Sequence, residues 1–184
     1  GLGNQMFQYA MAKAIAKKNK DKFKIDLSFY TNQKLRQYEL HYFSIDENIA
    51  DQSECSILKG ENGFIRKLMI RLGVKLNVPA SYICESKDDE TKFQSSIYNL
   101  TGSLYLEGYW QNEKYFKNIR NEILKDFEAK DKLSDNAIQH LEAIRATHSV
   151  SLHIRRGDYL SNSKANKVYG ICDLDYYKKA MTHI

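Results

Sequence analysis

Residues 153–159 read His-Ile-Arg-Arg-Gly-Asp-Tyr and bring two guanidinium groups, an imidazole and a carboxylate to the end of a predicted strand. In α/β folds, ligands bind at the carboxyl ends of the strands. Neighbouring side chains on a strand point to opposite faces, so Arg155 shares a face with His153. The glycine that follows permits a bend in which Arg156 is held at the turn, and Asp158 can pair with either arginine. The segment therefore predicts a ligand-binding cleft into which Arg155 reaches.

An arginine in such a cleft suits a phosphate ligand, because its planar fork matches phosphate oxygens and its charge persists at any relevant pH. An enzyme that expels a nucleoside diphosphate must stabilise negative charge on the leaving group, and arginine can do this without a metal ion. The Asp-Leu-Asp sequence at residues 173–175 is better explained as a helix cap than as a metal chelator. We therefore expect no metal and no cofactor. Taken alone, residues 153–159 fit a surface loop with salt bridges equally well.

The composition is that of a globular protein with a modest positive charge. Of the 184 residues, 42% are hydrophobic and 28% charged, and the net charge of +5 suits an anionic small ligand or weak attraction to a membrane surface. No dense basic block with interleaved aromatic residues is present, which disfavours nucleic acid as a partner. Sparse cysteines without a Cys-x-x-Cys spacing favour the cytoplasm, and peripheral association with the inner face of a membrane stays open. The three cysteines are Cys55, Cys84 and Cys172.

The first residues predict a glycine-rich turn followed by a helix. Residues 1–5 read Gly-Leu-Gly-Asn-Gln, and the apolar residues after them recur at helical spacing to about Lys18. Residues 23–27 then alternate apolar and polar, which indicates a strand. Because a turn of this type normally follows a strand, we expect one to precede residue 1 and the chain to be truncated there. Strand, turn, helix and strand make the opening unit of a doubly wound α/β domain.

The middle of the chain is less regular. Residues 38–45 fit a short strand and turn. Residues 64–72 carry an apolar stripe with a basic face, which favours a helix packed on the core over one lying on a membrane. Residues 103–110 predict a strand that leaves the sheet at Gly108. Apolar residues four apart then indicate an amphipathic helix over 115–127.

A second βα unit is expected at the end of the chain. Ser134 or Asp135 can cap a helix, and residues 150–154 alternate as a strand does. Residues 176–184 indicate an amphipathic helix that the chain ends within. These elements predict an α/β first domain at residues 1–130, a linker and helix at 131–148, and the incomplete start of a second Rossmann-like domain at 149–184.

Three segments are typical of one known family. Residues 1–10 read Gly-Leu-Gly-Asn-Gln-Met-Phe-Gln-Tyr-Ala, residues 107–116 read Glu-Gly-Tyr-Trp-Gln-Asn-Glu-Lys-Tyr-Phe, and the third segment is 153–159. The Asp-Tyr-Tyr at residues 175–177 fits as well. Together they resemble the family 11 glycosyltransferases, the bacterial-type α-1,2-fucosyltransferases. Their order and separation over nearly the whole chain argue against coincidence.

This resemblance implies a GT-B architecture, in which two Rossmann-like domains face a cleft. The first domain would lie on the acceptor side, and the second would bind GDP-fucose. The implied enzyme is a galactoside 2-α-L-fucosyltransferase. It would move L-fucose from GDP-β-L-fucose to the 2-hydroxyl of a β-galactoside on a galactose-terminated glycan, with inversion and without a metal ion.

The resemblance also implies roles for single residues. Arg155 would grip the β-phosphate, with His153 and Asp158 supporting its loop. Asn4 would lie across the cleft, near the fucose and the departing diphosphate, so Arg155 and Asn4 are the expected catalytic residues. The expected donor-binding set further includes Arg156, Gly3 and Gln5.

The chain departs from the family pattern at its end. The family carries an acidic segment and a Ser-rich, Trp-containing segment that complete the GDP-fucose pocket, and neither is present here. We therefore expect residues 1–184 alone to be inactive or nearly so. The sequence does not identify the general base. Two other interpretations stay open, namely another nucleotide-sugar transferase of the same architecture and a non-catalytic glycan-binding module.

Overall fold

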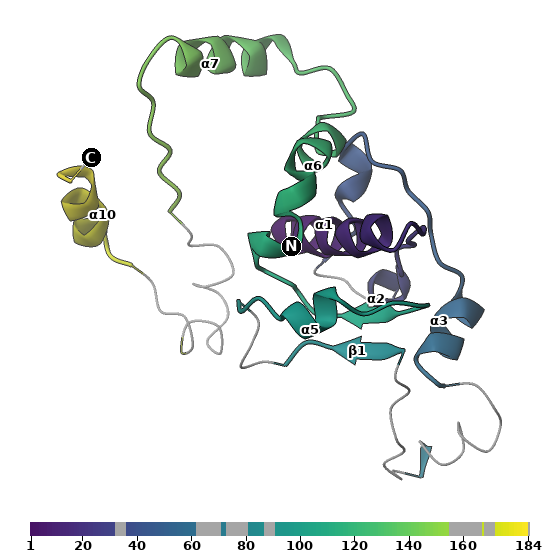
Figure 1. The fold of residues 1–184 in the computed structure, drawn as a ribbon. Helices are drawn as coiled ribbons and strands as arrows, with labels where there is room; N and C mark the ends of the chain where they lie inside the picture. Colours follow the sequence, from purple (N-terminus) through teal and green to yellow (C-terminus); the bar gives the residue numbers. More distant parts are fainter. Residues whose placement is uncertain are drawn as a thin grey trace. The chain divides into compact units, whose positions relative to one another are not determined.

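The computed structural model describes residues 1–31, 36–61, 71–72, 81–86, 91–154, 167 and 172–183 (Figure 1). The chain divides into two units, Gly1–Leu133 and Ser134–Ile184. The first unit is a mixed α/β structure with a small parallel sheet, which is compatible with a Rossmann-like domain. The GT-B arrangement and the predicted domain boundaries stay predictions. The helix predicted at residues 64–72 lies almost wholly outside the described residues.

Helix α1 (Leu2–Lys18) is the centre of the first unit. It ends at Lys18 as predicted, and its last turn carries Lys17 and Lys18, whose charges favour the negative end of a helix. An amphipathic helix buries one face, whereas α1 buries residues on more than one face. Its buried apolar residues are Tyr9, Ala10, Met11, Ala14, Ile15 and Ala16.

Two hydrophobic clusters explain this burial of α1. In one cluster, Tyr9 packs with Leu40 and with Ile123 of helix α6 (Arg120–Asp126). In the other, Met11 packs with Trp110 and with residues of the sheet. Figure 1 accordingly shows α1 between α6 on one side and the sheet on the other.

The sheet consists of two parallel strands, β1 (Tyr82–Cys84) and β2 (Tyr105–Glu107), with Ile83 opposite Leu106. Ile83 and Leu106 both pack on the cluster that contains Met11. Strand β2 is shorter than the predicted 103–110, but it leaves the sheet at Gly108 as predicted.

The strand predicted at residues 23–27 is wrong apart from one bridge, in which Ile25 pairs in parallel with Ile49. Asp26 accepts a hydrogen bond from the backbone N–H of Ser28 at 2.7 Å, and helix α2 (Ser28–Thr31) begins there. A side chain that bonds its own backbone in this way competes with a sheet ladder. Local hydrogen bonding therefore ends the extended segment early.

Residues 38–45 differ from the predicted strand and turn. They contain the 3₁₀ helix η1 (Leu40–Tyr42), followed by a single antiparallel bridge between Phe43 and Ala129. Leu40 is buried in the hydrophobic cluster that contains Tyr9 of α1. Burial of this leucine favours a tight turn over an extended strand.

Two further short helices belong to the first unit. Helix α3 (Gln52–Leu58) begins with a capping box in which Asp51 and Glu54 exchange hydrogen bonds with each other's backbone N–H. Helix α5 (Ser95–Tyr98) precedes β2. In the part of the chain that the structure describes, no helix is both long enough and apolar enough to cross a bilayer.

The helix predicted over residues 115–127 is broken into three pieces. They are η3 (Glu113–Tyr115), η4 (Lys117–Ile119) and α6. Phe116 interrupts the series because its backbone, with φ −126° and ψ 10°, is not helical. The predicted inward face is confirmed nevertheless, since Tyr115, Ile119 and Ile123 are all buried.

The second unit contains helices α7 (Asp135–Arg145) and α10 (Leu174–Met181). Ser134 caps α7 by accepting the N–H of Ala137, and Asp173 caps α10, so both predicted caps are confirmed. The strand predicted at residues 150–154 is not formed among the described residues. A strand exists only through pairing with a neighbour, and here the alternating apolar side chains are exposed.

Candidate active site

The carboxyl ends of the two parallel strands lie together at one edge of the sheet, beside the first turns of α1. Glu85 directly follows β1, and Gly108 directly follows β2. Gln8 of α1 reaches this edge, where its Nε2 donates to the carbonyl oxygen of Gly108 at 2.7 Å. Ligands bind at this edge in α/β folds. Asn4, Gln8, Glu85 and residues 108–111 therefore form the candidate active site, which we call the edge site.

Glu85 organises the turn that follows β2. The residue is only 9% exposed, and its Oε2 accepts the backbone N–H of Tyr109 at 2.6 Å. Both carboxylate oxygens also accept the N–H of Trp110, each at 3.1 Å. A buried carboxylate is costly unless such donors replace its water. These bonds therefore hold the carboxylate and the backbone of residues 109 and 110 in one arrangement.

The turn holds Trp110 in an unfavourable backbone conformation. Its φ is +56°, a region that bulky residues rarely adopt. The indole is 1% exposed and meets the ring of Tyr115 edge-on, with centroids 6.2 Å apart. Its burial and the Glu85 bonds together enforce this conformation. Such strain is typical of functional sites, which supports placing the site here.

Gly108 is required by the close approach of Glu85. A Cβ at position 108 would lie 2.8 Å from Oε2 of Glu85 and 3.0 Å from Cε2 of Trp110. These contacts are too short for any side chain, so only glycine lets β2 pass the carboxylate at this distance.

Asn4 lies in the first turn of α1 and contacts the same turn. Nε2 of Gln111 donates to Oδ1 of Asn4 at 2.8 Å. Since Oδ1 faces Gln111, Nδ2 of Asn4 points the other way, and no described residue accepts its hydrogens. The residue is half-buried. Asn4 thus presents two oriented N–H donors at the edge site.

The predicted glycine-rich turn is the first turn of α1 itself. The side chain of the N-cap residue makes no capping hydrogen bond, since that residue is Gly1, and the first turn carries no acidic residue. Gly3 is exposed, with nothing within 4 Å of the place where a Cβ would stand. The unpaired N–H groups at a helix N-terminus favour an anion. The first turn of α1 is therefore suited to negative charge.

Gln5 faces a different part of the unit. It is 4% exposed; its Nε2 donates to the carbonyl oxygen of Gln37 at 2.9 Å, and its Oε1 accepts the N–H of Glu39 at 2.9 Å. Both ends of the amide thus hold residues 37–39 against α1. A donor-binding role for Gln5 stays a prediction.

The remaining predicted residues belong to the second unit. His153 is exposed in the segment after α7. Arg155, Arg156 and Asp158 lie outside the described residues. The structure therefore joins Asn4 to residues 108–111 and does not test the donor-binding roles of the 153–159 segment.

The outer face of the sheet carries a second polar cluster. Asp26 accepts the hydroxyl of Tyr105 at 2.7 Å and is paired with Lys59 at 3.4 Å. Burial alone would raise the pKa of Asp26, but the hydrogen bonds from Ser28 and Tyr105 and the charge of Lys59 lower it to about 2. Burial raises the pKa of the nearby Cys55 thiol to about 11, and the charge of Asp26 adds to this effect. These shifts favour an inert structural cluster.

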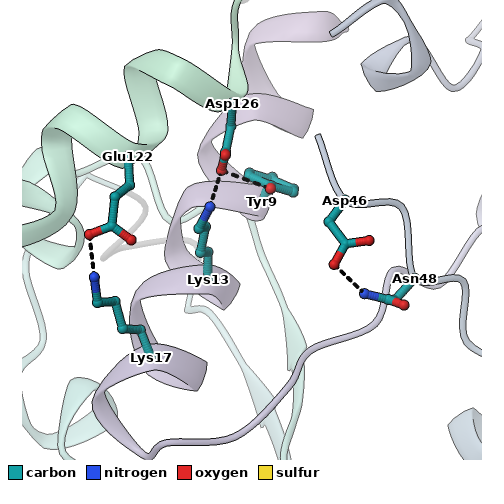
Figure 2. Close-up of polar contacts among 7 residues, drawn as sticks. All are labelled: Tyr9, Lys13, Lys17, Asp46, Asn48, Glu122 and Asp126. Atoms are coloured by element: carbon teal, nitrogen blue, oxygen red, sulfur yellow. Dashed lines mark hydrogen bonds and ion pairs between the residues drawn. The ribbon is translucent and has the colours of Figure 1, made fainter. Parts of the chain in front are cut away.

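A surface hollow of about 360 Å³ lies beside the C-terminal half of α1. Two of its three lysines are paired with carboxylates of α6, Lys13 with Asp126 and Lys17 with Glu122 (Figure 2). Asp126 also accepts the hydroxyl of Tyr9 at 2.9 Å. These contacts join α1 to α6 and neutralise two of the lysines, so the hollow is a weaker candidate for an anionic ligand than the edge site.

Within the described ranges, no group of three or more His, Cys, Asp or Glu side chains is arranged as a metal site would require. The metal-independent reaction stays a prediction.

Sequence reasoning did not identify Glu85, Gln8 or Gln111 as site residues. Gln8 and Gln111 lie inside segments 1–10 and 107–116, so their membership of those segments was the available signal. The residues around Glu85 show no clear helix or strand pattern. Its partners are the backbone N–H groups of Tyr109 and Trp110, which lie 24 and 25 positions further along the chain.

Comparison with known proteins covers the whole chain. The sequence model described as glycosyl transferase family 11 matches residues 1–184. An α-1,2-colitosyltransferase of Escherichia coli is 33% identical over 186 residues, covering 100% of this chain and 61% of the relative. An O-antigen biosynthesis glycosyltransferase of Escherichia coli, WbnK, is 31% identical over 200 residues, covering 100% of this chain and 65% of the relative. The chain spans less than two thirds of the length of these relatives. No solved structure matches it significantly.

Proposed function

The chain belongs to glycosyltransferase family 11, and on that premise we propose that its full-length protein moves L-fucose from GDP-β-L-fucose to the 2-hydroxyl of a β-galactoside. The reaction inverts the anomeric carbon and needs no metal ion. The observation that carries the proposal is the family match over residues 1–184. One relative is named for an α-1,2 linkage, which supports the choice of the 2-hydroxyl.

The edge site supports a role in the departure of the diphosphate. Transfer breaks the bond between the sugar carbon and a phosphate oxygen, and negative charge grows on that oxygen. Oriented N–H donors stabilise such charge most when they need not reorganise. The Nδ2 of Asn4 and the backbone N–H groups in the first turn of α1 are donors of this kind. Gly3 leaves room for a phosphate to approach the helix.

The second unit contributes the permanent charge. We assign Arg155 to the β-phosphate, where its fork matches two oxygens. We assign His153 and Asp158 to the support of its loop and include Arg156 in the donor-binding set. In this assignment Arg155 and Asn4 each stabilise negative charge on the departing diphosphate.

A second donor is favoured by a specific observation, since one relative is named an α-1,2-colitosyltransferase. Colitose is fucose without its 3-hydroxyl, so the two donors share the diphosphate and most of the sugar. A site built to hydrogen-bond the 3-hydroxyl rejects colitose strongly, whereas an apolar site discriminates weakly. The donor that this protein prefers therefore depends on the group facing that position.

The acceptor we propose is a galactose-terminated glycan of a surface polysaccharide, assembled at the cytoplasmic face of a membrane. One relative is named an O-antigen biosynthesis glycosyltransferase, which supports this acceptor class. Fractionation of cells that express the tagged full-length protein tests the location.

The experiment uses the full-length protein with GDP-fucose, nucleotide-activated colitose and GDP-mannose as donors. The acceptors are a β-galactoside and its matched 2-deoxy analogue, which lacks the hydroxyl that should react. We expect an α-1,2-linked deoxysugar on the first acceptor, no product on the second, and unchanged rates with EDTA. If neither deoxysugar is transferred, the proposed function is wrong.

A further inference from the structure

We propose that Glu85 is a positioning residue, which acts through the turn at residues 108–111 to fix the amide of Asn4. The proposal rests on the proposed function, because it assigns Glu85 to the reaction that Asn4 serves. Glu85 itself does not touch the substrate.

The first step is the contact between Glu85 and the turn. Its carboxylate bonds the N–H groups of Tyr109 and Trp110, at 2.6 Å and 3.1 Å. Gly108 leaves the space that the carboxylate needs. The buried carboxylate and the glycine that makes room for it lie side by side, so both residues are fitted to this contact.

The second step is the conformation that this contact enforces. Trp110 has φ +56°, and a bulky residue leaves that region when nothing holds it there. The turn is anchored upstream, where Gln8 bonds the carbonyl oxygen of Gly108, and downstream, where Asn112 bonds the carbonyl oxygen of Thr91 at 2.8 Å. Glu85 holds the centre between these anchors. Its loss lets the chain between them rotate.

The third step links the turn to Asn4. Gln111 is the residue directly after Trp110, so rotation at Trp110 moves its side chain. Its Nε2 is the donor that keeps Oδ1 of Asn4 turned inward, with Nδ2 turned outward. Without that donor the amide can reverse and direct its oxygen toward the diphosphate, which repels it. Glu85 therefore determines which end of Asn4 meets the leaving group.

The test uses the full-length protein and Glu85→Gln, which keeps the shape but removes the charge and replaces one of the two accepting oxygens by an NH₂ group. Exchange of the amide hydrogens at residues 109 and 110 should quicken by about tenfold or more. The kcat should fall on the order of 10- to 100-fold, while KM for the donor changes by less than about threefold. In an Asn4→Ala background, Glu85→Gln should lower kcat by less than about threefold further.

Asp126→Asn is the matched control. Asp126 is also a part-buried carboxylate that holds α1, through Tyr9 and Lys13, yet it does not contact the edge site. It should lower thermal stability without the loss of kcat. If Glu85→Gln does not fold, Gln111→Leu tests the same link from the other end and should be equally non-additive with Asn4→Ala.

The outcomes separate the two proposals. An active wild type in which Glu85→Gln and Asn4→Ala multiply their effects overturns the positioning role and leaves the proposed function intact. Unchanged amide exchange in Glu85→Gln also overturns it. A wild type that transfers neither deoxysugar overturns the proposed function, and the positioning role with it.

Discussion

Nε2 of Gln111 donates a hydrogen bond to Oδ1 of Asn4 at 2.8 Å, across 107 residues of sequence. Asn4 belongs to segment 1–10 and Gln111 to segment 107–116, two segments that the family resemblance identified separately. The structure brings both to the carboxyl edge of one parallel sheet. Their direct contact gives a physical reason why one chain carries both segments, since the second orients a side chain of the first.

Gln111→Glu tests this orientation. The carboxylate removes the donor that faces Oδ1 of Asn4, so the amide should reverse and offer Nδ2 to the new acceptor. We expect kcat for sugar transfer to fall about tenfold or more with little change in stability. Gln139→Glu makes the same chemical change on the exposed face of α7 and should leave kcat unchanged. Equal rates for both variants would remove Gln111 from the site.

Gly108→Ala tests the close approach of Glu85. The new Cβ would lie 2.8 Å from Oε2 of Glu85, so we expect the free energy of unfolding to fall by about 1–3 kcal/mol. Gly102→Ala is the comparison, because position 102 has φ +85° but open space around it and should cost only about 1 kcal/mol. Urea denaturation gives both values. A Gly108→Ala protein as stable as the wild type would show that the turn yields easily.

The elements that the sequence predicts well have local signals. Helix α1 ends at Lys18, where the apolar spacing stops, and β2 leaves the sheet at Gly108. Ser134 caps α7 through its own hydroxyl. In each case the residues that decide the structure are neighbours in the chain, so a reading of the sequence can find them.

The elements that the sequence misses depend on distant partners. The segment predicted as a strand at residues 23–27 keeps only the bridge of Ile25, whose partner Ile49 is distant in the chain. Glu85 looks like any surface carboxylate until its backbone partners are known. Trp110 adopts a left-handed backbone that a glycine would have signalled, and no pattern marks a tryptophan held there by burial.

Asp26→Asn tests the buried cluster through pH. The pKa of Asp26 is lowered in the folded protein to about 2, below its ordinary value of 3.8, so the ionised form stabilises the fold. That stabilisation, about 1–2 kcal/mol, is complete above roughly pH 4 and is lost as the pH falls toward 2. We therefore expect wild type to exceed Asp26→Asn in unfolding free energy at pH 6, with the gap narrowing as the pH falls through about 2. Asp131→Asn makes the same chemical change at an exposed position and serves as the comparison variant.

Arg155→Ala tests the donor site of the second unit. Loss of the charge that we assign to the β-phosphate should abolish GDP binding by the full-length protein, as measured by calorimetry. Arg145→Ala removes the same group from the exposed last turn of α7 and should bind GDP normally. Undiminished GDP binding by Arg155→Ala would discard the assignment.

Gly3→Ala distinguishes the needs of the fold from those of the ligand. Gly3 lies within α1, and nothing stands within 4 Å of its missing Cβ, so the fold has no use for a glycine there. Alanine should raise the free energy of unfolding by about 0.5–1 kcal/mol, because it is the better helix former. If a phosphate approaches the first turn of α1, the same methyl group should raise the donor KM and lower kcat. A variant that gains stability and keeps full activity would place the diphosphate elsewhere, because a helix start that tolerates a side chain cannot be the surface on which the leaving group rests.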